Sequence, residues 1–238
     1  MMKIMKMRYL IIWLCMCCSS ICADDRTMSD PLESINRVTY QFNKAADQLF
    51  LKPVAKSYHK FAPEILQYTV GNFFANLSNI PTFINTVLQG RFHDAAGTLA
   101  RFTINTVVGI GGLFDPASHV NLPKHKADFG QTLARFGYKH SMYLVLPLLG
   151  PSTVRDVFGR SVDSFAGVAP HINSHAARNQ FMAASTINKR TKLLGREEVL
   201  DLAVDEYILV RDAYVQYRDY KFAVDEQDVD PLLGEPPE

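Results

Sequence analysis

The feature that most constrains this chain is the absence of charge from three of its segments. Residues 65–90 and 141–154 contain no Asp, Glu, Lys or Arg, and residues 164–177 carry only histidines as titratable groups. The chain from 65 to 177 has 13 charged residues in 113, whereas 178–238 has 21 in 61. Because about a quarter of the residues of a soluble domain are charged, the middle of the chain is poorly suited to a surface that lies wholly in water.

The longest charge-free segment, 65–90, does not have the composition of a membrane span. It contains Pro81 and many neutral polar residues among its large apolar ones. Its asparagines include Asn72, Asn76, Asn79 and Asn85, and its phenylalanines are Phe73, Phe74 and Phe83. The pattern predicts an amphipathic helix with an uncharged polar face, which would lie in a membrane plane or line a polar passage. Core helices of a soluble protein are the alternative, and this segment alone does not exclude them.

A second apolar stretch, 102–114, lies between Arg101 and Asp115 and contains three glycines within four residues. As a helix it would be about 20 Å long, which is short of the ~30 Å hydrocarbon core of a bilayer. The glycines lack the spacing of a phosphate-binding loop. We expect a helix that turns back within one leaflet and returns to water at Asp115 and Pro116. The membrane-embedded candidates are Phe73, Phe74, Phe83, Ile104, Val107, Ile110, Leu113 and Phe114.

Apolar residues at helical spacing predict helices through most of the remaining chain. A start signal at 30–33 opens the first helix. Further helices are expected at 53–62, 91–108, 176–194 and 196–220, and the best candidate for a short strand is 143–146. The pattern predicts an all-α domain over residues 24–222. Residues 223–238 hold six acidic and no basic residues, and this composition predicts a disordered tail.

The first 23 residues have the pattern of a signal peptide. Lys3, Lys6 and Arg8 precede a short apolar run, and small residues follow it up to Ala23. All four cysteines of the chain lie in this segment. Cleavage after Ala23 would therefore leave no cysteine for disulfides or metal binding. The alternative is a lipoprotein signal in which one cysteine is acylated, and Cys18 is the best candidate for that lipid anchor.

No residue pattern indicates catalysis, metal binding or a cofactor. Asp128-Phe129-Gly130 resembles a kinase triplet, but the other kinase motifs are absent. His171 and His175 have the spacing of two metal ligands on a helix, without a glutamate in the position that a zinc protease requires. A formal net charge of +1 is not that of a typical nucleic-acid-binding protein. We therefore expect no enzyme, no metal and no nucleic-acid partner.

Six blocks of the chain resemble, in order, the MlaA (VacJ) family of outer-membrane proteins. Together they cover roughly residues 30–222. The blocks are SDPLESINRVTYQFNK, KPVAKSYHKFAP, NFFANLSNIPTFINTVLQG, ARFTINTVVGIGGLFD, DFGQTLARFGYKHSMYLVLPLLGPSTVRDVFG and DEYILVRDAYVQYRDYKF. The resemblance implies a ring-shaped bundle of amphipathic helices that lies in the periplasmic leaflet of the outer membrane and has a central amphipathic channel.

The family resemblance also implies a function in retrograde phospholipid transport. Such proteins remove phospholipids from the outer leaflet and pass them to a soluble periplasmic carrier, which feeds an inner-membrane ABC transporter with an MCE-type subunit. They also associate with trimeric porins. In the first block Asn36, Arg37, Tyr40 and Phe42 match the family pattern, while Gln41 stands where the family commonly has Asn. We expect the first helix to close or gate the ring, although Tyr40 and Phe42 would also suit simple packing.

The channel wall is expected to include Asn72, Asn76, Asn79 and Asn85, unless these amides pair helices instead. Several basic residues would meet lipid phosphates or reach from the rim into water. They are Arg91, Arg101, Lys124, Lys126, Arg135, Lys139 and Arg155. Two other functions compete with lipid transport: a porin-associated scaffold without its own lipid passage, and a soluble periplasmic helical hydrolase.

Overall fold

The structure is a computed structural model that describes residues 30–227. The signal segment 1–23, the candidate anchor Cys18 and residues 228–238 lie outside the described residues. All the helices and strands described belong to one compact unit that begins at Leu32. Apart from one short hairpin they are helical, which confirms the all-α class.

The helices differ greatly in length, from a single turn to seven turns. They are α2 (Glu33–Ala46), α3 (Lys52–Phe61), α4 (Glu64–Leu88), α5 (Phe92–Val107), α6 (Pro116–His119), α7 (Phe129–Arg135), α8 (Val154–Ala166), α9 (His175–Thr191), α10 (Glu198–Asp201) and α11 (Glu206–Gln227). A π-helical turn, η1 (Asp47–Leu51), joins α2 to α3, and a 3₁₀ turn, η2 (Ala169–His171), precedes α9.

The chain remains helical from α2 through η1 to α3, although Pro53 indicated a new helix at that point. Pro53 lies in the first turn of α3, where the N–H that proline lacks is least needed. The wider π turn changes the helical phase without ending the helix. One continuous helical segment therefore covers residues 33–61.

The two strands, β1 (Tyr143–Leu146) and β2 (Gly150–Thr153), form one antiparallel hairpin. Tyr143 pairs with Thr153, and Leu146 pairs with Gly150. The expected strand at 143–146 is thereby confirmed. Tyr143 and Val145 on β1 form a small apolar cluster with Tyr207 of α11.

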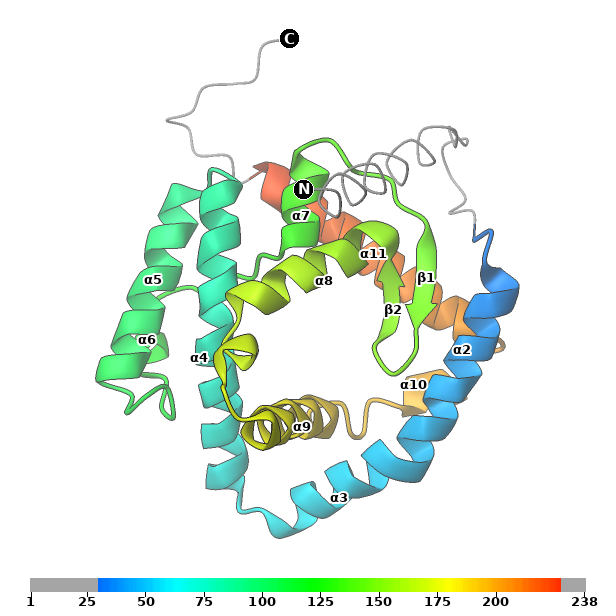
Figure 1. The fold of residues 1–238 in the computed structure, drawn as a ribbon, viewed down its shortest axis with the longest axis horizontal. Coiled ribbons are helices and arrows are strands. Elements are labelled where there is room, and N and C mark those ends of the chain that lie inside the picture. The colour runs from blue at the N-terminus through cyan, green and yellow to red at the C-terminus, as the bar shows by residue number, and fades with distance from the viewer. Residues whose placement is uncertain (1–29, 228–238) are drawn as a thin grey trace, which may run out of the picture. The chain divides into compact units, whose positions relative to one another are not determined.

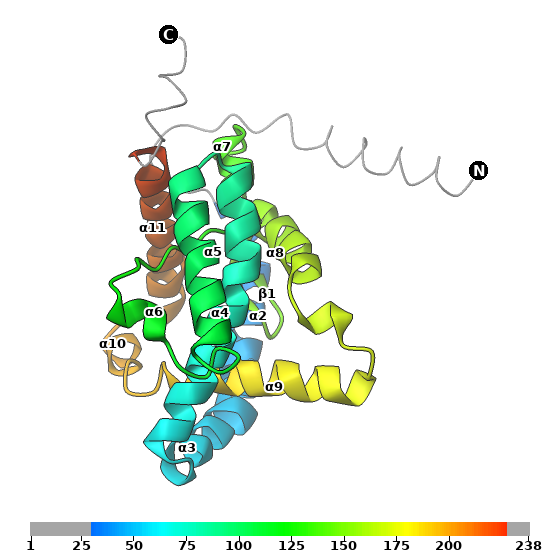
Figure 2. The same cartoon turned by 90° about the vertical axis from the view of Figure 1, so that its left-hand side faces the viewer.

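Contacts between elements close a cycle within this unit (Figure 1). Helix α2 packs on β1, β1 pairs with β2, and β2 contacts α8. Helix α8 contacts α4, α4 contacts α9, and α9 packs on α3, which the chain joins back to α2. Helix α5 packs along α4, and α9 crosses the direction of these two helices (Figure 2). The cycle brings the first helix against a hairpin more than 100 residues away.

The C-terminal part of the domain differs from the expected single helix over 196–220. A short α10 ends at Asp201, and α11 begins only at Glu206. Helix α11 then continues to Gln227, so residues 223–227 are helical and do not belong to a disordered tail. Helix α11 contacts α7 and β2 and thereby covers the hairpin.

Candidate functional site

Polar and apolar side chains are distributed in the reverse of the usual order. Among the described residues eight buried side chains are apolar, five of them alanines, whereas nineteen are polar or charged. Thirty-five large apolar residues are exposed. A domain surrounded by water gains about 25 cal/mol for each Å² of apolar surface that it buries. This unit leaves much of that surface uncovered, so its exterior suits an apolar environment.

The asparagines of α4 show how the interior is built. Asn85, which is 1% exposed, donates to Asp163 of α8 over 2.7 Å and accepts from Thr132 of α7 over 2.9 Å. Asn76 is also buried and donates to Thr106 on α5 over 2.9 Å. These two amides therefore pair helices, which is the second of the two roles expected for them.

The other two candidate asparagines of α4 are only partly buried. Asn72 donates to the carbonyl of Leu113 over 3.3 Å, and Asn79 donates to Asn76 Oδ1 over 3.4 Å. Asn72 thus adds to the contact between α4 and the turn after α5, whereas the Asn79 bond stays within α4. Helix α4 also exposes the apolar residues Ile65, Leu66, Ile84, Val87 and Leu88.

The glycine stretch forms a tight turn after α5. The N–H of Gly112 bonds to Asn105 O over 2.8 Å, and the N–H of Phe114 bonds to Gly109 O over 2.9 Å. Gly112 has a φ of +88° and faces Asn76, whose side chain would lie 2.6 Å from an added Cβ. The turn that the glycines predicted is confirmed, and one of them allows α4 to approach closely.

The apolar residues of this turn point away from the unit. Val107 is 75% exposed and Ile110 66% exposed, and Leu113 and Phe114 are also exposed. The other membrane-embedded candidates, Phe73, Phe74, Phe83 and Ile104, are half-buried. Phe74 packs edge-on against Phe181 of α9 at 5.2 Å between ring centroids. The turn residues thus form an apolar tip, which we define as Val107, Val108, Ile110, Leu113 and Phe114.

Asp115 does not mark a return to water, because it is buried below this turn. Arg101 Nη2 lies 2.7 Å from Asp115 Oδ1, and Lys124 Nζ lies 2.8 Å from Oδ2. Burial alone would raise the pKa of Asp115, but hydrogen bonds from Lys124, Ser118 and Asn105 and the charge of Arg101 outweigh it and lower that pKa. The carboxylate therefore holds the turn to α5 and also caps α6.

The first helix is fastened to the hairpin by two asparagines. Asn36, 2% exposed, donates to Tyr143 O over 3.3 Å and accepts from Val145 N over 2.8 Å. Asn43 bonds in the same way, because it donates to Leu146 O over 2.9 Å and accepts from Leu148 N over 2.6 Å. The spacing of seven residues was a signal for Asn43 that the sequence interpretation missed.

The remaining candidates on α2 divide between contacts with the start of α11 and the exterior. Arg37 pairs with Asp205 over 2.8 Å and stacks 4.5 Å from the ring centroid of Tyr207. Burial and the nearby charge of Glu206 raise the pKa of Tyr40 to about 12. Both residues join α2 to the start of α11, whereas Phe42 is exposed. These contacts agree with a helix that closes the cycle.

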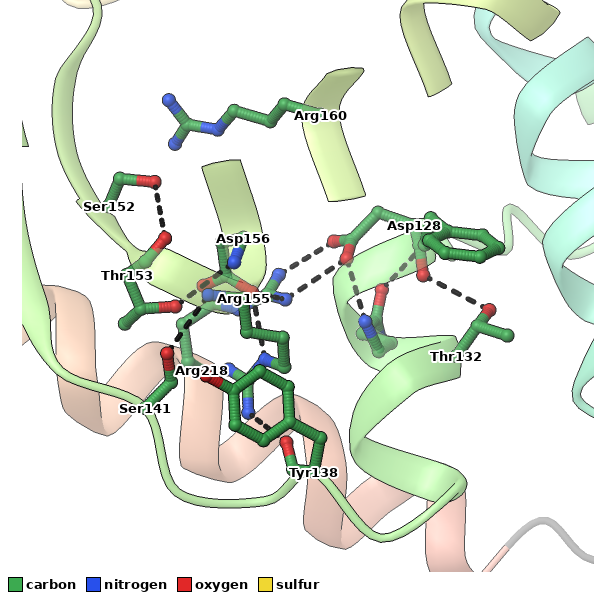
Figure 3. A network of polar contacts seen from close by, with 12 residues as sticks. Asp128, Thr132, Tyr138, Ser141, Ser152, Thr153, Arg155, Asp156, Arg160 and Arg218 are labelled. Carbon is green, nitrogen blue, oxygen red and sulfur yellow. Dashed lines mark hydrogen bonds and ion pairs between the residues drawn. The ribbon is translucent and has the colours of Figure 1, made fainter. Parts of the chain in front are cut away.

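A buried ion network joins α7, α8 and α11 (Figure 3). Arg218 of α11 binds Asp128 at 2.6 and 3.0 Å and Asp156 at 2.7 Å. Tyr214 donates to the other oxygen of Asp156 over 2.7 Å. Arg155 also contacts Asp156, at 3.1 Å. Because buried charges are costly unless they are paired, this network specifies how the three helices meet.

Several basic residues expected to meet phosphates are occupied by internal partners. Arg91 pairs with Asp94 over 2.5 Å, and Arg101 and Arg155 are held by Asp115 and Asp156. All three guanidinium groups are buried. The prediction that they contact lipid is therefore wrong. Lys124 also binds Asp115, although its side chain is largely exposed.

Arg160 of α8 is different, and the sequence interpretation did not select it. Its side chain extends away from the buried network beside β2 (Figure 3). In the described part of the chain it bonds only to backbone carbonyls, those of Leu149 at 3.4 Å and Pro151 at 3.0 Å. Its exposed guanidinium lies between two elements of the contact cycle and is suited to bind an anion.

An open groove of about 650 Å³ lies between α10 and α11. Its lining is mainly apolar and includes Val199, Leu202, Val204 and Ile208, with Asp205 and Asp212 among the polar residues.

Within residues 30–227 no group of three or more His, Cys, Asp or Glu side chains is placed to hold a metal ion. In the same residues we find no helix with the length and hydropathy needed to cross a membrane.

Comparison with known proteins gives consistent matches. The family model described as "MlaA lipoprotein" matches residues 28–221. The "Intermembrane phospholipid transport system lipoprotein MlaA" of Escherichia coli is 32% identical over 207 residues, which are 85% of this chain and 82% of that protein. The protein of the same name from Haemophilus influenzae is 32% identical over 199 residues, 81% of this chain and 79% of the relative.

A solved structure is also similar. It is described as "Structural basis for maintenance of bacterial outer membrane lipid asymmetry" and aligns with a TM-score of 0.73 at 31% sequence identity. The alignment covers 81% of this chain and 98% of the solved chain.

Proposed function

The chain belongs to the MlaA lipoprotein family, which transports lipid and catalyses no reaction, and from this premise we propose that it keeps phospholipids out of the outer leaflet of the outer membrane. It takes misplaced phospholipids from that leaflet through a channel. It then passes them to a soluble periplasmic carrier, which delivers them to an inner-membrane ABC transporter with an MCE-type subunit.

The observation that carries this proposal is the reversed distribution of polar and apolar residues around a closed cycle of contacts. An ionised side chain in hydrocarbon costs several kcal/mol, so a unit embedded in one leaflet needs an uncharged apolar exterior. The apolar tip and the exposed face of α4 have that character. We place the unit in the periplasmic leaflet of the outer membrane, with the lipid passage inside the cycle.

The physical task of such a passage is to carry a charged headgroup past hydrocarbon. Moving a phosphate into an apolar medium without partners is prohibitively costly, and polar groups along the path remove most of that cost. Arg160 is our candidate for a phosphate contact, because guanidinium groups bind phosphate with two parallel hydrogen bonds. The acyl chains would follow along the exposed apolar side chains.

Two kinds of protein partner follow from this placement. A trimeric outer-membrane porin would cover part of the apolar exterior, and the periplasmic carrier would dock on the side that faces water. A lipid on Cys18, if that cysteine is retained, would add a membrane anchor. These partners are part of the proposal, as is the location in the outer membrane.

The experiment that tests the function measures phospholipid in the outer leaflet of a strain that lacks this chain. We expect accumulation there, sensitivity to detergent, and restoration of both by the intact chain. An unchanged lipid distribution in the deletion strain would refute transport. If the intact chain restored asymmetry equally well with its passage blocked by crosslinks, a porin-associated scaffold would be the better account.

A further inference from the structure

Four ionised side chains of alternating sign meet where α3 packs against α9. Arg190, at the C-terminal end of α9, binds both oxygens of Asp47, with Nε–Oδ1 at 2.7 Å and Nη2–Oδ2 at 2.8 Å. The same guanidinium donates to Glu197, and Glu197 accepts a further bond from Lys52. The four residues therefore form a continuous chain of ion pairs, which we call the clasp.

The clasp brackets the π turn. Asp47 is the first residue of η1, and Lys52 follows its last residue. Their partners lie about 140 positions later in the chain, at the end of α9 and just before α10. The clasp thus connects both ends of the turn to the opposite side of the contact α3–α9, which belongs to the closed cycle.

Partial burial makes these pairs stronger than ordinary surface pairs. The Arg190 side chain is 11% exposed, and those of Asp47 and Glu197 are 29% and 27% exposed. Burial alone would raise the pKa of Glu197, but its bonds to Lys52 and Arg190 lower it. The Glu197 carboxylate is therefore stabilised in its ionised form, and each opening of the clasp leaves charges without their partners.

The π turn itself has little else to hold it. None of its five residues is buried, and Leu49 and Phe50 are 69% and 71% exposed. Helix α3 buries only Ala55. Single π turns inside helices occur frequently at functional sites. The clasp is thus the main polar link at the start of the segment from η1 through α3, whereas Gln67 of α4 holds its end by bonds to the carbonyls of His59 and Ala62.

We propose that the clasp is a latch on a lateral opening between α3 and α9. With its ion pairs formed, α3 is held against α9 and the cycle is closed. When they separate, η1 and the start of α3 move away from α9, and acyl chains pass sideways between the cycle and the surrounding leaflet. What passes through the opening rests on the proposed function, whereas the latch itself is a property of the fold.

Hydrogen exchange on the full chain in detergent micelles tests the latch. Arg190→Gln keeps a polar side chain but shortens it and removes its charge. We expect amide exchange across residues 47–61 to accelerate about tenfold or more, since hydrogen bonds to charged groups contribute that much to a local opening equilibrium. Exchange in α4 and α5 is expected to stay as in the unmodified chain.

Three further variants sharpen the result. Asp47→Asn should accelerate the same segment, and the double variant with Arg190→Gln should add little, because both changes break one interaction. Glu197→Gln weakens the links to Lys52 and Arg190 but keeps the two bonds between Arg190 and Asp47, so it should have a smaller effect. Arg178→Gln is the matched control, since Arg178 lies on the same helix and bonds to His175 at the surface. It should leave exchange of 47–61 unchanged.

The outcomes separate the latch from the function. Unchanged exchange of residues 47–61 in Arg190→Gln would overturn the latch, and so would faster exchange spread equally over all helices in both Arg190→Gln and Glu197→Gln. If the latch is correct, Arg190→Gln should also fail to restore outer-leaflet phospholipid to the level of the unmodified chain. An unchanged lipid distribution in the deletion strain would refute transport alone and leave the exchange result standing.

Discussion

Asn36 and Asn43, seven residues apart on α2, bind the hairpin in the same way. Each accepts the N–H of one residue and donates to the carbonyl two positions before it, first at Tyr143 and Val145 and then at Leu146 and Leu148. Seven residues of helix rise about 10.5 Å, and three residues of strand advance about 10 Å. The two distances match, so the side-chain amides of α2 can bond to the backbone of the hairpin much as a neighbouring strand would.

This match predicts unequal effects of removing the two amides. Asn36→Ala leaves a buried N–H of Val145 without that partner and should lower the free energy of unfolding by about 2 kcal/mol or more. Asn43→Ala acts at a position that is only partly buried and should cost about 1 kcal/mol or less. Denaturant unfolding in detergent micelles measures both. Equal losses would contradict the assignment of Asn36 as the buried link.

The glycine turn provides a matched pair of substitutions. Gly111 and Gly112 both have positive φ, but only an added Cβ at Gly112 would collide with Asn76. Gly111→Ala should therefore cost only the backbone strain, about 1 kcal/mol. Gly112→Ala should cost clearly more, because α4 and the turn must also move apart. The comparison uses thermal unfolding, and a ranking with Gly111→Ala as the worse variant would exclude close packing as the role of Gly112.

Ile110 is predicted to lower the free energy of unfolding while its apolar side chain favours contact with lipid. It adopts a φ of +52° although its side chain is β-branched, whereas Asn121 occupies a similar φ of +58° elsewhere. Ile110→Asn should raise the free energy of unfolding by up to about 1 kcal/mol and weaken binding to phospholipid vesicles about tenfold. Ile110→Leu, which keeps the apolar side chain, should bind vesicles as before. If Ile110→Asn bound vesicles as strongly as the unmodified chain, insertion of the apolar tip into the membrane would be contradicted.

The buried pair Arg101–Asp115 predicts a pH-dependent stability. Because the folded pKa of Asp115 is lowered, its contribution is complete above the unfolded pKa of about 4 and is lost as pH falls through the folded value. Asp115→Asn leaves Arg101 buried without its carboxylate and should cost about 3 kcal/mol at pH 7. The free energy of unfolding should differ less between Asp115→Asn and the unmodified chain at pH 3 than at pH 7. A constant difference would mean that the carboxylate charge is unimportant.

Arg160 provides a prediction for transport rather than stability. Arg160→Gln removes an exposed charge that bonds only to carbonyls, so the free energy of unfolding should change by less than about 0.5 kcal/mol. Removal of outer-leaflet phospholipid should nonetheless slow several-fold, and Arg160→Lys should retain part of the rate. A rate equal to that of the unmodified chain in Arg160→Gln would remove this residue from the passage.

Local features of the fold were predictable from the sequence because their causes are local. Helix α5 lies within one residue of its expected bounds at each end, since its apolar residues recur at helical spacing. Strand β1 occupies the expected 143–146, and the glycines at 109–112 form the expected turn. The joined helices α2 and α3 and the gap between α10 and α11 were missed. The gap has a local cause that the interpretation overlooked, because the Asp205 side chain accepts the N–H of Ile208 and caps the start of α11.

The roles of the polar residues could not be predicted in the same way. An asparagine on an apolar helix has the same appearance in the sequence whether it faces a lipid headgroup or another helix. Asn85 became a helix-pairing residue only because Thr132 and Asp163, far along the chain, reached it. The position of Asp115 after an apolar stretch suggested a residue in contact with water, but Asp115 is buried in an ion pair with Arg101.

The sequence by itself determined that the unit is helical and that its middle carries too little charge for a wholly aqueous surface, because composition and periodicity act through each residue separately. Only the tertiary structure decided which polar residues are buried together and which charge remains at the surface. Pairing depends on distances between elements that the linear pattern does not contain. The clasp around the π turn is the clearest case, since its four residues lie at two places in the chain and meet only when the cycle closes.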